Sequence, residues 1–140
     1  MEVYVFGNED YIQDNVPLQL LKELRRILPE ISFHVVKPNE DLPFDKKQDV
    51  AIMDTIMGLR KPTLLKDTDM DKITLSPRTS VHDFDLAFQL KYLKKLGKLE
   101  NFTIIGLPMV QILTPQTKEQ LYSEIHSILK KLVAQDMQGS

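Results

Sequence analysis

The chain has 140 residues, a formal net charge of −2 and no cysteine. With 42% hydrophobic and 27% charged residues, it is expected to be a globular protein with one core. The charge balance gives no support to nucleic-acid binding, and the lack of cysteine excludes disulfides, thiolate catalysis and cysteine-based metal sites. No apolar segment approaches the roughly 20 residues that span a bilayer, and no secretory signal is visible.

We therefore expect a cytoplasmic protein with no membrane partner. We expect one domain over residues 1–137 and a tail over 138–140, which we interpret as a cloning remnant.

The first part of the chain alternates strand-like and helical patterns. Residues 2–7 (EVYVFG) predict a buried strand, and Pro17 suits the first position of the helix that follows a polar stretch. Four leucines at helical spacing give this helix one apolar face before Pro29 ends it: Leu20, Leu21, Leu24 and Leu28. A second strand is predicted over 31–36 and a loop over 39–48. A third strand over 49–54 (DVAIMD) is apolar on both faces, as a strand covered by helices requires.

The second part is less regular at first. Residues 55–72 suggest a short helix or turn, and 73–75 predict a short fourth strand. A helix is expected over 83–96, with Gly97 as its stop, and a buried strand over 102–106. Residues 107–114 should form a loop or an irregular edge, and Pro115 should open the last helix. This order predicts a three-layer α/β/α sandwich around a mostly parallel sheet of about five strands.

Three residues with metal-binding side chains fall at predicted junctions between strands and helices: Asp14, Asp54 and His82. In an open parallel sheet, ligands bind outside the carboxyl ends of the strands. Two carboxylates and an imidazole are suitable ligands for a borderline metal ion. Each residue also has a simpler explanation: Asp54 could accept hydrogen bonds from the next loop, Asp14 could cap a helix, and His82 could be solvated. His34 and His126 are weaker candidates, because a strand edge and a helix surface explain them.

Short motifs around these residues resemble the hydrogenase maturation proteases. Gly7-Asn8, followed six residues later by Asp14 and a helix, is similar to the opening of that family. The third strand, ending in Asp54, and residues 80–86 (SVHDFDL), containing His82, resemble its second acidic strand and its histidine segment. Residues 102–108 (FTIIGLP) resemble its late strand. The resemblance covers nearly the whole chain in order and spacing.

The resemblance implies a single-domain endopeptidase. Such an enzyme removes a C-terminal peptide from the large-subunit precursor of a nickel–iron hydrogenase after nickel has been inserted. The nickel would be supplied by the substrate, and Asp14, Asp54 and His82 would contact it. The chain departs from the family pattern at Gln13, which replaces the first acid of a pair, and at Pro17, where a glycine is common. The glycine-rich stretch that normally follows the second strand is also missing.

Two alternatives stay open. A receiver-like signalling domain would use Glu9, Asp10 and Asp54 as a magnesium pocket with a phosphoacceptor. However, receivers carry a lysine just after the last strand, where this chain has Leu107-Pro108, and a receiver has no use for His82. The second alternative is a family-like protein that binds its partner without cutting it.

Overall fold

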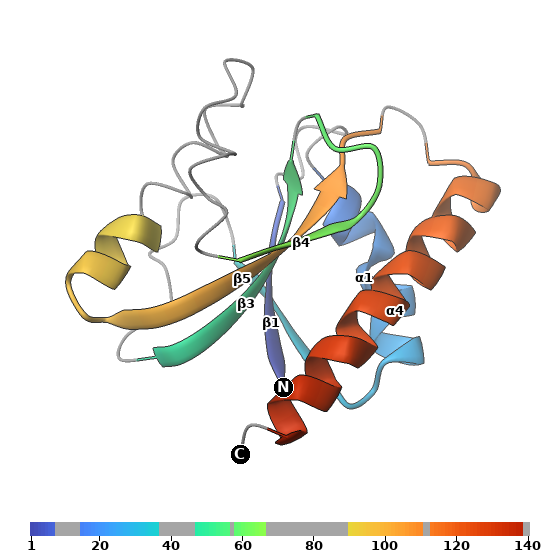
Figure 1. The fold of residues 1–140 in the computed structure, drawn as a ribbon. Helices are drawn as coiled ribbons and strands as arrows, with labels where there is room; N and C mark the ends of the chain where they lie inside the picture. Colours follow the sequence, from blue (N-terminus) through green and yellow to red (C-terminus); the bar gives the residue numbers. More distant parts are fainter. Residues whose placement is uncertain (8–14, 37–46, 57, 67–89, 111–112, 139–140) are drawn as a thin grey trace.

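The computed structural model describes residues 1–7, 15–36, 47–56, 58–66, 90–110 and 113–138 (Figure 1). The elements in these ranges are, in chain order, β1 (Glu2–Phe6), α1 (Val16–Ile27), β2 (Ser32–Val36), β3 (Lys47–Ile56), β4 (Thr63–Lys66), β5 (Leu99–Pro108) and α4 (Pro115–Gln138). A helical stretch over 90–95 precedes β5.

The strands form one five-stranded sheet in the order β2-β1-β3-β5-β4. β1, β2, β3 and β5 run parallel to their neighbours, while β4 pairs antiparallel to β5 at the edge. Helices α1 and α4 lie together on one side of the sheet, and the 90–95 stretch lies on the other (Figure 1). A mostly parallel sheet between helical layers confirms the predicted fold class.

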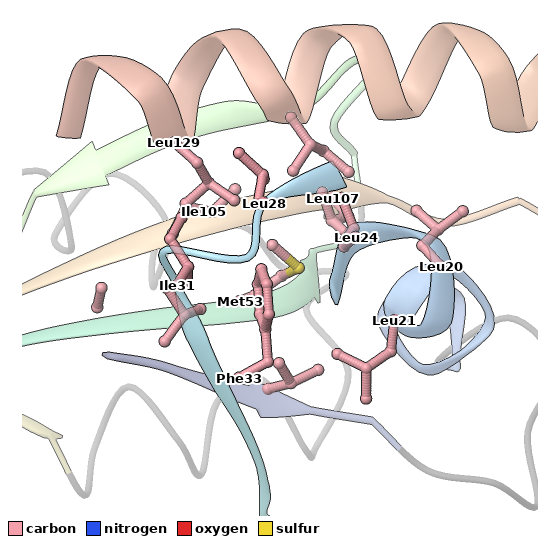
Figure 2. Packing of buried hydrophobic residues seen from close by; sticks show 14 of the residues in the cluster. Leu20, Leu21, Leu24, Leu28, Ile31, Phe33, Met53, Ile105, Leu107 and Leu129 are labelled. Carbon is pink, nitrogen blue, oxygen red and sulfur yellow. The ribbon is translucent and has the colours of Figure 1, made fainter. Parts of the chain in front are cut away.

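The face of the sheet under α1 and α4, here called the first face, holds the larger apolar cluster. Figure 2 shows Leu24 of α1, Leu28 just after that helix and Leu129 of α4 converging on the central strands, where Met53 and Ile105 lie. Helix α1 begins at Val16, one residue before the predicted start, and Pro17 lies in its first turn, where its missing N–H leaves no helical bond unmade. Although α4 has 24 residues, no helix in the described ranges is apolar and long enough to cross a membrane.

The opposite face, here called the second face, is covered in part by the 90–95 stretch. Leu90 is completely buried there against Ile52 of β3 and Ile104 of β5, with Leu93 partly buried beside it. The helical stretch ends before Gly97, whose φ of +77° is a left-handed conformation that favours glycine. This confirms the predicted stop.

Three details of the prediction were wrong. β3 is longer than expected and extends two residues beyond Asp54 to Ile56. A strand, β4, forms in a region predicted to be a short helix or turn, because its pairing with the distant β5 outweighs its weak local pattern. β5 continues through Pro108, so residues 107 and 108 belong to the sheet. The loop was predicted over 39–48, but residues 47 and 48 belong to β3. The rest of that loop, the strand over 73–75 and the helix start at 83–89 lie outside the described residues.

Candidate functional site

Asp54 is the one predicted site residue in the part of the chain that the structure describes. It lies near the carboxyl end of β3, the central strand, with Gly106 of β5 directly opposite. The parallel strands β1, β3 and β5 end at the same rim of the sheet. Asp54 is therefore at the rim where ligands bind in open α/β sheets.

The Asp54 carboxylate is buried in the second face. The residue is only 3% exposed, and the neighbouring Thr55 is 2% exposed. The backbone N–H of Thr55 donates a hydrogen bond of 2.8 Å to Oδ1 of Asp54. A buried carboxylate is costly unless hydrogen bonds hold it, so this bond helps to stabilise and orient the group. The donor of this bond is the next residue of the same strand.

Asp14 and His82 lie outside the described residues, as do Glu9 and Asp10. The meeting of Asp14, Asp54 and His82 at one site therefore stays a prediction. Among the residues that the structure does describe, no group of three or more histidine or acidic side chains is placed to hold a metal ion. The N-cap position of α1 is Asn15, the residue after Asp14, and the Asn15 side chain makes no capping hydrogen bond.

The two weaker histidine candidates lie on surface elements. His34 is on the edge strand β2, where its ring stacks on Tyr4 with centroids 5.3 Å apart. Its Nε2 is 3.3 Å from Oε1 of Glu2, and the side chain is 45% exposed. His126 is partly buried on α4. These surroundings agree with the structural roles expected for both residues.

Gly106 is a feature of the site that sequence reasoning did not single out. A Cβ atom at this position would lie 2.7 Å from Cδ1 of Leu59 and 2.8 Å from Cδ1 of Ile56. The two apolar side chains thus fill the place that a side chain at position 106 would take. A glycine inside an otherwise apolar strand was the available signal, since it often marks a close approach.

Comparison with known proteins found likeness in structure but not in sequence. No protein-family model and no curated protein matches the chain. The hydrogenase maturating endopeptidase HybD from E. coli is similar with 17% identity and a TM-score of 0.68, covering 96% of this chain and 94% of that one. The solution structure of an endopeptidase from Escherichia coli gives 18% identity and a TM-score of 0.69, with 94% and 92% covered.

A third solved structure extends the likeness to another organism. The [NiFe] hydrogenase maturation protease HybD from Thermococcus kodakarensis is 16% identical with a TM-score of 0.61, covering 94% of this chain and 99% of that chain. At such identities, likeness establishes the fold. The chain thus has a three-layer α/β/α architecture, and in particular the fold of the hydrogenase maturation proteases over nearly its whole length. The resemblance inferred from short motifs is confirmed at this level.

Proposed function

We propose that the protein is an endopeptidase that removes a C-terminal peptide from the nickel-loaded large-subunit precursor of a hydrogenase. The support is the whole-chain likeness in fold to proteins named as hydrogenase maturation endopeptidases. The observation that carries the proposal is Asp54. It is a buried carboxylate at the carboxyl rim of the central strand, the place where a sheet of this kind binds its ligand.

In this proposal, Asp54 contacts the nickel that the substrate carries, together with Asp14 and His82. Imidazole nitrogen suits nickel, and carboxylate oxygens add negative charge to the ligand set. The hydrogen bond from the Thr55 N–H holds the Asp54 carboxylate in one orientation before the substrate arrives. Cleavage adds water across the peptide bond and releases a new C-terminal carboxylate and an amine. A metal ion beside the scissile carbonyl would polarise it or activate that water.

The receiver alternative has less support from the described part of the fold. A receiver domain has the flavodoxin-like strand order 2-1-3-4-5. In this protein, β5 lies between β3 and the antiparallel β4. Leu107, which stands where a receiver would carry its lysine, is completely buried in the first face. Both observations favour the protease.

The test is incubation of the protein with a nickel-matured large-subunit precursor, followed by mass spectrometry of the precursor's C-terminus. We expect loss of a C-terminal peptide, and no loss from a nickel-free precursor. Asp54→Asn and His82→Ala should each abolish cleavage while the far-UV circular dichroism spectrum stays unchanged. Normal cleavage by His82→Ala, or by Asp14→Asn combined with Asp54→Asn, would remove the metal-contact assignment. Stable binding of the precursor without cleavage would instead support the partner-binding alternative.

A further inference from the structure

The connection from β3 to β4 has to cross β5. These two strands are consecutive in the described chain, but β5 lies between them in the sheet. Figure 1 shows the green segment after β3 passing around the carboxyl end of β5 before it enters β4. Thr63, the first residue of β4, pairs with Gly106. Residues 58–62 of the connection therefore lie close to the rim that carries Asp54.

Leu59 is the residue of this connection that reaches the sheet. It is partly buried and packs against the apolar cluster of the second face. Its Cδ1 would be only 2.7 Å from a Cβ at position 106, a distance that no real Cβ could accept without movement. The absence of a side chain at Gly106 is thus what allows Leu59 to lie so deep.

The Leu59 side chain therefore lies beside Asp54. Gly106 is the residue directly opposite Asp54, and neighbouring strands are about 4.8 Å apart. Successive side chains of a strand alternate between faces, so Asp54 shares the second face with Ile52 and Ile56. Because Leu59 and Ile56 fill the place above Gly106, they place apolar atoms next to a carboxylate that is 3% exposed.

We propose that Leu59 is an apolar cover for Asp54, which keeps water and free cations from the carboxylate until a substrate displaces it. Leu59 is then a positioning residue, and Gly106 provides the space into which it fits. The role of Leu59 in cleavage rests on the proposed function, because Asp54 has to be uncovered only if it contacts the substrate. The cover itself is a property of the free protein and is testable without substrate.

The test measures how fast Asp54 reacts with a carbodiimide and glycine ethyl ester, read by peptide mapping and mass spectrometry. Asp54 should react slowly in the wild type compared with the exposed Glu100. In the Leu59→Ala variant, the rate of Asp54 modification should rise on the order of tenfold. This change corresponds to a free-energy difference of about 1.4 kcal/mol. Gly106→Ala should also raise the rate, because the added methyl group displaces Leu59 without removing it.

Two matched variants keep the proposal open to refutation. Leu65→Ala removes another partly buried leucine of the same cluster, which pairs with Ile104 and not with the residue opposite Asp54. It should leave the Asp54 rate unchanged, as should the volume-conserving Leu59→Met. Equal rates in Leu59→Ala and Leu65→Ala, or an Asp54 as reactive as Glu100 in the wild type, would overturn the proposal. Since no precursor is present, a failure of the proposed protease function would not affect this result.

Discussion

The first and second faces of the sheet follow the same two-residue alternation but differ at the carboxyl rim. On the first face, Met53, Ile105 and Leu107 are all completely buried, and they continue one apolar cluster under α1 and α4. On the second face, the alternation places Asp54 where an apolar side chain would be expected and Gly106 beside it. The first face thus supplies stability, whereas the second gives up apolar packing at the rim to hold a carboxylate.

The largest expected effect comes from the first face. Leu24→Ala should lower the free energy of unfolding by about 2–5 kcal/mol, because Leu24 is completely buried and the change leaves a cavity. Chemical denaturation gives the value. The exposed apolar residue Tyr92 offers the matched control, since Tyr92→Ala should cost far less. A Leu24→Ala protein as stable as Tyr92→Ala would contradict the assignment of the core.

The next effect concerns the helical stretch that covers the second face. Gly97→Ala should cost roughly 1–2 kcal/mol, because φ is +77° and an L-residue is strained there. The cost is conformational, since nothing lies within 4 Å of the added Cβ. Gly97→Asn should be less destabilising in the same thermal unfolding experiment, because asparagine tolerates this conformation better. Equal stability of the wild type and Gly97→Ala would show that the helix ends differently.

Asp54→Asn separates the roles of the two faces. We expect the free energy of unfolding to change by only about 1 kcal/mol, because the amide oxygen can still accept the bond from the Thr55 N–H. Cleavage of the precursor should nevertheless be lost, since the amide has no charge to offer a metal ion. Chemical denaturation gives the free energy of unfolding, and the cleavage assay on the same preparation gives the activity. Together they test whether Asp54 serves function rather than stability. A loss of stability as large as that of Leu24→Ala would make Asp54 mainly a structural residue.

The smallest effect lies at the far end of the first face. The hydrogen bond from Lys130 of α4, 2.7 Å long, lowers the pKa of Glu30 from its ordinary value. A carboxyl group with a lowered pKa in the folded state stabilises the protein above its unfolded-state pKa, and this contribution is lost as the pH falls through the folded-state pKa. Glu30→Gln should therefore have a slightly lower melting temperature than the wild type at neutral pH. The two melting curves should coincide in strong acid.

Much of the fold could be predicted because its signals are local. The leucines of α1 recur at helical spacing, and the apolar run before Asp54 is long enough to indicate a strand buried on both faces. The strand β4 could not be found in this way. Its four residues carry a weak pattern, and its antiparallel pairing is with residues 103–106, far along the chain.

The candidate site was predictable in part. The sequence placed Asp54 at the end of a central strand, and the structure locates it near that rim. Its burial could not be predicted, because β3 continues past it and Leu59 reaches Gly106 only through a crossing of the sheet. Asp14 and His82 lie outside the described residues, so their part in the site stays a prediction.

The most direct test of the central claim is a crystal structure of the protein bound to the nickel-loaded large-subunit precursor, with the ion located by its anomalous scattering. We predict one nickel ion at the carboxyl rim, in contact with Asp14, Asp54 and His82 and reached by displacement of Leu59. Nickel bound elsewhere, or three side chains too far apart to share one ion, would contradict the account.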